Sequence, residues 1–313
     1  MKFAFVFPGQ GSQSVGMLAA FVAAHEDYPA VRDTLAEASD VLHQDIAALV
    51  AEGPLDQLGL TINTQPLMLA ADIAIFRAWR ATGGDAPLVV AGHSLGEYAA
   101  LVAAGVIDFS TALPLVRFRA EAMQEAVPVG TGTMAVILGL EDDAVRACCI
   151  ESAQHEVVEA VNFNAPMQVV IAGHRGAVER ACDAAKAKGA KRALILPVSA
   201  PFHSSLMKPA ADRLAGHLAG VAFSTPQVDV INNIDVAMPR DAASIREALV
   251  RQAFGPVRWA ETIRKMAADG VTHVVECGPG KILAGLTRRV DGNLLSSAIV
   301  DPASLLQTRE LLR

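Results

Sequence analysis

"PLVVAGHSLGEYAALVAAG" (residues 87–105) places a serine, flanked by two glycines, between a run of small and β-branched residues and an alanine-rich segment. The first part is typical of a buried strand and the second of a helix, so Ser94 stands at a strand-to-helix turn. In a nucleophile elbow, a side chain at either glycine would collide with the neighbouring strand or helix. The stretch therefore predicts an α/β fold in which the Ser94 hydroxyl and the Leu95 backbone N–H face the same open space. A tight packing turn of small residues is the alternative interpretation.

Composition sets the broad class of the protein. The chain has 313 residues, of which 52% are hydrophobic and 5% aromatic, enough for one large domain and a smaller one. Its net charge of -7 argues against nucleic acid as the main partner. The four cysteines form no Cys-x-x-Cys pair, so we expect neither a zinc site nor a disulfide framework. The first apolar run, residues 2–7, is too short for a signal peptide or a membrane span, and we expect a cytoplasmic protein.

Periodicity divides the chain into two patterns. Fully apolar runs at 2–7 and 86–92 are typical of strands in a central parallel sheet, and they alternate with helical periodicity over 17–50, 65–82 and about 110–126. Three later strands are expected at 228–233, 273–278 and 297–300.

The region between Pro128 and Pro197 has a different pattern. Strands are expected at 133–140, 156–163, 168–173 and 191–198, and helices at 141–153 and 175–189, with a turn at 164–166. This βαββαβ order predicts a ferredoxin-like unit inserted into the larger α/β structure.

A serine hydroxyl needs a base to become a nucleophile. His203, in "SAPFHSSLMKPAAD", follows a strand and should lie at the C-terminal edge of the sheet, where catalytic groups gather in open α/β sheets; an exposed loop histidine is the alternative. His93 adjoins Ser94, but neighbouring side chains on a sharp turn point apart, so we interpret it as packing. No acidic residue stands in a recognisable motif for a third triad member, and a backbone carbonyl could orient the histidine instead.

An oxyanion needs a second donor besides the Leu95 N–H. The loop "FPGQGSQ" (7–13) follows the first strand at the same sheet edge, and its Gln10 N–H could face the reacting carbonyl. A phosphate-binding loop is the weaker interpretation, because neither Lys-Ser/Thr nor Gly-x-Gly-x-x-Gly spacing is present.

Six stretches, in order from residue 3 to about 290, stand out together: "FVFPGQGSQ", "GHSLGEYAALVAAGVIDF", "RAEAMQEAVP", "NFNAPMQVVIAG", "PFHSSLMKPAAD" and "ECGPGKILAGLTRR". In combination they resemble the malonyl-CoA:acyl carrier protein transacylase family. The resemblance implies a hydrolase-like parallel-sheet domain, residues 1–127 plus 197–313, with a ferredoxin-like subdomain inserted at 128–196.

The resemblance also implies catalytic roles. Ser94 would be the acylated nucleophile and His203 its general base and acid. The backbone N–H groups of Gln10 and Leu95 would form the oxyanion hole. The main-chain carbonyl of Gln252, in "VRQAFGPVRW", would orient the histidine and so replace the missing carboxylate.

Four further residues are expected to bind the substrate. Arg119, in "RFRAEAMQ", matches the arginine that binds the free malonyl carboxylate, a suitable choice because a guanidinium offers two parallel donors to a planar anion. Arg117 competes for this role, but its register with "AMQEAVP" differs. Asn162 matches a supporting polar residue at the domain junction, and His93 is expected beside it. In related acyltransferase domains a Phe just before the histidine accompanies malonyl specificity, so the resemblance implies that Phe202 favours malonyl over α-methylated acyl groups.

The implied reaction moves a malonyl group from malonyl-CoA, through a serine ester, to the phosphopantetheine thiol of acyl carrier protein for fatty acid synthesis. No metal or cofactor is implied. Carrier proteins of this kind are acidic, so a net negative chain would need a local basic region to dock one. The candidates, called the basic patch below, are Lys186, Lys188, Lys191, Arg192, Arg288 and Arg289.

Three alternatives remain open at this point. A discrete acyltransferase serving a polyketide synthase in trans would use the same residues and differ in its partner. A serine esterase or thioesterase would not need the Arg119 clamp. A non-catalytic binding module would not need the Ser94–His203 pair.

Overall fold

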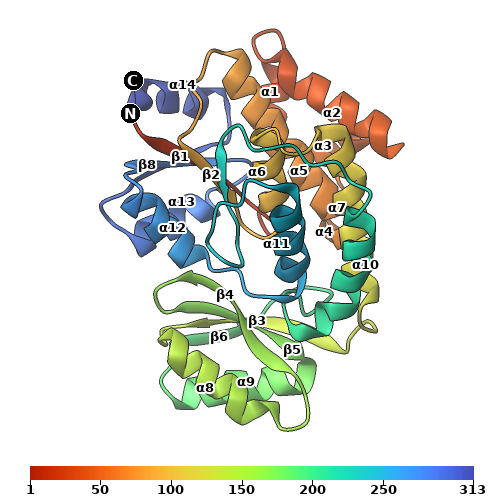
Figure 1. Ribbon diagram of the computed structural model, residues 1–313, viewed down its shortest axis with the longest axis vertical. Helices are drawn as coiled ribbons and strands as arrows, with labels where there is room; N and C mark the ends of the chain where they lie inside the picture. Colours follow the sequence, from red (N-terminus) through yellow and green to blue (C-terminus); the bar gives the residue numbers. More distant parts are fainter.

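Two separate β-sheets organise the chain, and the computed structural model describes all 313 residues (Figure 1). The first sheet is parallel throughout, with strand order β7-β2-β1-β8-β9. Its strands are β1 (Phe3–Phe7), β2 (Val89–Gly92), β7 (Asp229–Ile231), β8 (His273–Cys277) and β9 (Leu295–Ile299). Apolar runs without alternation are expected for strands that helices cover on both faces.

Strand β1 shows how the two faces differ. Successive side chains point to opposite faces of a strand. Phe3, Phe5 and Phe7 join the larger core with the long helix α5 (Thr61–Ala81), where the Phe5 and Trp79 rings meet edge to face at 5.4 Å. The small side chains between them face a second core beneath α12 (Trp259–Ala268) and α13 (Ile282–Val290).

The remaining helices of this part pack mainly on the phenylalanine side of the sheet. They are α1 (Ala19–Ala23), α2 (Pro29–Leu42), α3 (Ile46–Glu52), α4 (Leu55–Gly59), α6 (Gly96–Ala103), α7 (Phe109–Glu125), α10 (Lys208–Leu218), α11 (Ala242–Phe254) and α14 (Pro302–Leu312), with a 3₁₀ turn at Ser205–Met207. None of the helices is both long enough and apolar enough to cross a membrane.

The second sheet is antiparallel, with strand order β4-β5-β3-β6. Its strands are β3 (Gly132–Leu138), β4 (Val158–Ala165), β5 (Gln168–His174) and β6 (Arg192–Ile195). Helices α8 (Asp142–Ala153) and α9 (Arg175–Ala187) cover the face turned away from the rest of the molecule (Figure 1). The predicted fold class, a parallel-sheet part combined with a ferredoxin-like βαββαβ unit, is confirmed.

The turn between β4 and β5 was placed too early by the sequence. Residues 164 and 165 still belong to β4, and the chain reverses at Pro166 and Met167, where Met167 has a φ of 59°. Strand β4 continues to Ala165 because that residue still pairs with Gln168 of β5. Beside its contact with β5, the Val257 N–H donates to the Val161 carbonyl at 2.8 Å, and the Phe163 N–H donates to the Val257 carbonyl at 2.9 Å. These bonds join the two sheet systems next to the pocket described below.

Candidate active site

The strand-to-helix turn at Ser94 has the geometry of a nucleophile elbow. Strand β2 ends at Gly92, helix α6 begins at Gly96, and Ser94 between them has a left-handed φ of 53°. A Cβ at Gly92 would lie 1.9 Å from the Gly96 carbonyl, and a Cβ at Gly96 would lie 2.1 Å from the Phe7 carbonyl oxygen. Neither position admits a side chain, and this close approach holds Ser94 at the tip of the turn.

His203 reaches Ser94 from a loop between β6 and the 3₁₀ turn. The Ser94 Oγ lies 2.7 Å from His203 Nε2, and His203 Nδ1 lies 2.9 Å from the Gln252 carbonyl oxygen. Because a carbonyl only accepts, Nδ1 carries the proton and Nε2 is free to accept from the serine. His203 is also left-handed, with a φ of 65°. Both members of the pair thus occupy backbone conformations that are uncommon for non-glycine residues.

The surroundings keep this histidine neutral. Burial, and next the positive charge of Arg119, lower the pKa of His203 from its usual 6.5 to about 3. A neutral imidazole is the form that can accept a proton, so the ring is ready to act as a base well below neutral pH.

Arg119 projects from α7 into the same site and is only 2% exposed. Its Nη1 donates to Gln65 Oε1 at 2.7 Å, and its Nη2 donates to Gln252 Oε1 at 2.9 Å and to Ser94 Oγ at 3.3 Å. Its Nε is buried and has no partner. Arg119 makes no salt bridge, so the site holds a buried cation without a carboxylate partner, and its Nη2 lies close to the serine hydroxyl. Arg117, in contrast, is bonded to the Leu42 carbonyl and the Gln44 side chain, outside the pocket.

Two backbone donors complete the arrangement. The N–H groups of Gln10 and Leu95 make no hydrogen bond within the protein, and both residues line the pocket. Gly9 lets the two loops meet, since a Cβ there would lie 2.5 Å from the His93 carbonyl oxygen. The Gln10 side chain accepts from Thr61 at 2.9 Å, which anchors this loop to α5. The pocket therefore offers two free N–H groups beside a serine, as an oxyanion site requires.

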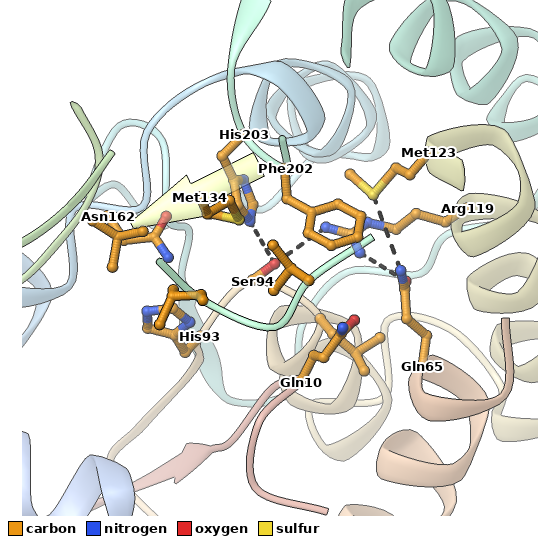
Figure 2. Close-up of a pocket in the computed structure, with 14 residues that line it drawn as sticks. Gln10, Gln65, His93, Ser94, Arg119, Met123, Met134, Asn162, Phe202 and His203 are labelled. Carbon is orange, nitrogen blue, oxygen red and sulfur yellow. Dashed lines mark hydrogen bonds between the residues drawn. The ribbon is translucent and has the colours of Figure 1, made fainter. Parts of the chain in front are cut away.

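The structure brings most of the predicted residues into one pocket, and Figure 2 shows Ser94 between His203 and Arg119. Phe202 and Asn162 line it, and the Asn162 Oδ1 is buried without a hydrogen-bond partner. Gln252 does not line the pocket and acts only through its hydrogen bonds. The His93 side chain turns toward Asn164, 2.8 Å from Nε2, and packs edge to face on Trp259. The full lining is Gln10, Gln65, His93, Ser94, Leu95, Arg119, Met123, Met134, Asn162, Val170, Leu196, Val198, Phe202 and His203.

Comparison with known proteins identifies the family of the chain over nearly its whole length. Residues 4–293 match the acyl transferase domain family. The malonyl CoA-acyl carrier protein transacylase of Salmonella typhimurium is 56% identical over 304 residues, 97% of each chain. That of Escherichia coli K12 is 54% identical over 310 residues, 99% of each. The chain belongs to the malonyl CoA-acyl carrier protein transacylase family.

Solved structures of other transacylases superpose closely on this one. An acyl-carrier-protein S-malonyltransferase from Burkholderia pseudomallei is 65% identical and has a TM-score of 0.97, covering 99% of this chain and 100% of its own. A malonyl-transacylase solved in complex with a type II polyketide synthase acyl-carrier protein is 54% identical, with a TM-score of 0.97 and coverage of 99% and 100%.

Two lysines of the predicted basic patch are paired with acidic side chains. Lys188 pairs with Glu151 at 2.7 Å, and Lys186 with Asp183 at 3.3 Å. Arg192 of β6 and Gln168 of β5 both pair with Leu138 of β3, one on each side. Arg289 donates a hydrogen bond to the Gln168 side chain. Lys186 and Lys188 thus have acidic partners, whereas Arg192 and Arg289 lie at the end of the second sheet formed by Leu138 and Gln168.

Sequence reasoning missed three polar residues: Gln65, which lines the transacylase pocket, and Glu97 and Asn233, which do not. Gln65 holds Arg119, while Glu97 and Asn233 lie behind the elbow and are both buried. Two signals were present: Glu97 follows Ser94 by three residues, and Asn233 ends an expected strand at the sheet edge where site residues gather. No group of three or more His, Cys, Asp or Glu side chains is arranged to hold a metal ion.

Proposed function

We propose that the protein transfers a malonyl group from malonyl-CoA to the phosphopantetheine thiol of acyl carrier protein, through an ester on Ser94, and so supplies fatty acid synthesis. One observation carries the proposal. The Nη2 of the buried Arg119 lies 3.3 Å from Ser94 Oγ, and Ser94 is hydrogen-bonded to the neutral His203. The Nε of the same guanidinium is buried and has no partner. This arrangement suits an acyl group that ends in a carboxylate, and relatives at 54–56% identity carry malonyl in their names.

In the first half of the reaction, Ser94 Oγ attacks the thioester carbonyl while His203 Nε2 takes the hydroxyl proton. The negative charge formed on the carbonyl oxygen is stabilised by the N–H groups of Gln10 and Leu95, which have no other partner. The carbon–sulfur bond then breaks, and His203 returns the proton to the leaving CoA sulfur. The Gln252 carbonyl holds the ring in the required tautomer and stabilises the imidazolium.

The second half reverses these steps with a different thiol. The phosphopantetheine thiol gives its proton to His203 and attacks the malonyl ester, and Ser94 leaves with that proton. Arg119 holds the malonyl carboxylate in both halves, which keeps the ester carbonyl in the oxyanion site. The proposed steps use no metal or redox cofactor.

Acyl selectivity rests on the residues around Arg119. We assign to Phe202 the exclusion of α-methyl groups, because its ring lines the pocket directly before His203. Discrimination of one methyl by pocket size is worth about 1–3 kcal/mol, so we expect a preference rather than complete exclusion. We assign Asn162 to the malonyl chain, supported by its unpartnered Oδ1. His93 contributes indirectly, by a hydrogen bond to Asn164 that fixes the end of β4 beside the pocket.

Domain division and partner follow from the same proposal. We divide the chain into a catalytic domain, residues 1–127 plus 197–313, and a small subdomain, 128–196, with the acyl group bound between them. We propose that acyl carrier protein docks on the basic patch, chiefly on Lys191, Arg192, Arg288 and Arg289, for which no salt bridge is found. A cytoplasmic location agrees with four cysteines that are all free and buried.

A second candidate partner is supported by one comparison. The malonyl-transacylase solved with a polyketide synthase carrier protein is 54% identical to this chain, so a carrier protein of polyketide synthesis is the alternative acceptor. Transfer rates to the two kinds of carrier protein, measured side by side, decide which one is served. An esterase role is disfavoured, because the buried cation would have no function in it.

Intact-mass spectrometry tests the proposed function. After mixing with malonyl-CoA, the protein should gain the mass of one malonyl group, and Ser94→Ala should gain none. Added phosphopantetheinylated acyl carrier protein should then remove the label and appear malonylated itself. If the parent protein shows no adduct, or if the adduct survives in Ser94→Ala, the proposed function is wrong.

A further inference from the structure

Glu97 is a buried carboxylate beside the site that the mechanism above does not use. It lies on α6, three residues after Ser94, and is 2% exposed. It makes no salt bridge. Instead its Oε2 accepts from the backbone N–H of Asn233 at 2.9 Å and from Gln252 Nε2 at 3.0 Å. One carboxylate oxygen therefore joins two segments that are distant from the elbow in sequence.

The first segment holds the elbow through the Asn233 side chain. Asn233 Oδ1 accepts from the Ser94 backbone N–H at 2.7 Å, and Asn233 Nδ2 donates to the Gly92 carbonyl at 2.7 Å. The amide thus bridges both sides of the turn on which the nucleophile sits. Because Ser94 has a left-handed φ, its conformation persists only where the surroundings impose it. Glu97 places Asn233 by binding its backbone.

The second segment holds Arg119 through the Gln252 side chain. Gln252 Nε2 donates to the Ser94 carbonyl at 2.9 Å as well as to Glu97, so both of its hydrogens are used. Its Oε1 is then turned toward Arg119 Nη2, 2.9 Å away. A flipped amide would set oxygen against the Glu97 carboxylate and NH₂ against the guanidinium. Glu97 therefore decides which end of Gln252 meets the arginine.

We propose that Glu97 is a positioning residue that aligns the nucleophile and the malonyl-binding arginine together, acting on Ser94 through Asn233 and on Arg119 through Gln252. This inference rests on the proposed function. It requires a hydrogen-bond acceptor at the position of Oε2 and does not require a negative charge. Glu97 itself touches neither Ser94 Oγ nor the pocket.

Two conservative variants separate position from charge. Glu97→Gln keeps the side-chain length and one carbonyl oxygen but loses the charge. Glu97→Asp keeps the charge but withdraws the oxygens by one methylene. We expect Glu97→Asp to lower kcat/KM for malonyl-CoA by about 100-fold, the effect of roughly 1 Å of misplacement, with kcat falling and KM rising. Glu97→Gln should stay close to the parent. Acylation of Ser94 is followed by rapid quenching and intact-mass spectrometry.

Asp301→Ala is the matched control. Asp301 also accepts a backbone N–H, that of Ser304 at 2.7 Å, but it does so at the start of α14, away from the pocket. This variant should lower the unfolding midpoint without changing kcat. It shows what loss of stability alone does to the assay.

The outcomes are distinct. If Glu97→Gln loses as much activity as Glu97→Asp, the negative charge of Glu97 is needed. If Glu97→Asp keeps parental activity, the position of the carboxylate oxygens is not important. Either result overturns the proposal. If Glu97→Asp does not fold by circular dichroism, Asn233→Ala takes its place and should lower kcat while KM for malonyl-CoA is kept. Parental kcat in Asn233→Ala would also overturn it. Failure of the parent itself to be malonylated would refute the proposed function instead.

Discussion

Replacing Arg119 by alanine should change the acyl group that the enzyme prefers. The guanidinium is 2% exposed, its Nε has no partner, and its Nη2 lies 3.3 Å from Ser94 Oγ. Two hydrogen bonds from it to a malonyl carboxylate, at about 1.5–3 kcal/mol each, amount to about 3–6 kcal/mol. Their loss should lower kcat/KM for malonyl-CoA by about 10²–10⁴-fold. Acetyl-CoA has no carboxylate, so its transfer loses none of this contribution.

The ratio of the two substrates isolates this effect. Alanine at 119 also removes the donor to Gln65 Oε1 and to Gln252 Oε1, but any resulting displacement of Ser94 affects malonyl-CoA and acetyl-CoA alike. Removing the cation raises the pKa of His203 from about 3 toward its usual 6.5, so the base remains mostly neutral at pH 7.5 and does not explain a lost rate. The assay is single-turnover acylation of Ser94 by each substrate, followed by intact mass.

Arg117→Ala is the control for losing an arginine from the same helix, because Arg117 is bonded to Leu42 and Gln44 outside the pocket. It should leave the malonyl-to-acetyl ratio unchanged. The assignment of Arg119 is refuted if its alanine variant transfers malonyl at the parental rate, or if both acyl groups lose the same factor.

Three further predictions address the elbow, the base and the carrier protein. Gly96→Ala would place a Cβ 2.1 Å from the Phe7 carbonyl oxygen and should lower the free energy of unfolding in urea by about 3 kcal/mol. Gly216→Ala, whose Cβ would have nothing within 4 Å, should raise that free energy by about 0.5–1 kcal/mol. Equal effects of the two variants would contradict the packing account. The pKa of His203 is lowered to about 3 in the folded protein, so between pH 3 and 6.5 the unfolded chain binds more protons than the folded one. This group therefore lowers the free energy of unfolding by ~1.4 kcal/mol for each pH unit as pH falls through that range. His203→Gln should remove that slope, and an unchanged slope in urea titrations at pH 4.5–6.5 would speak against it. Raising sodium chloride should increase KM for acyl carrier protein more than KM for malonyl-CoA, because salt screens the exposed basic patch, and equal increases would exclude that docking surface.

The features that the sequence predicted well are local ones. The buried strands, the glycine-flanked turn at Ser94 and the βαββαβ order each follow from residue spacing within one or two elements. The reversal after β4 was misplaced because Ala165 still pairs with Gln168 of β5, and because Asn164 is hydrogen-bonded to His93, which lies 71 positions away.

The sequence by itself determined the α/β fold class, the elbow and its serine, because helix and strand periods and the space around a glycine depend on near neighbours. Gln252 was named only through a family resemblance, and Gln65, Glu97 and Asn233 were missed altogether. The tertiary structure decided how these side chains are joined. Asn233 binds the Ser94 N–H across 139 positions and Gln252 binds its carbonyl across 158. A polar side chain has many potential partners, and only the packing of distant strands and helices leaves it one.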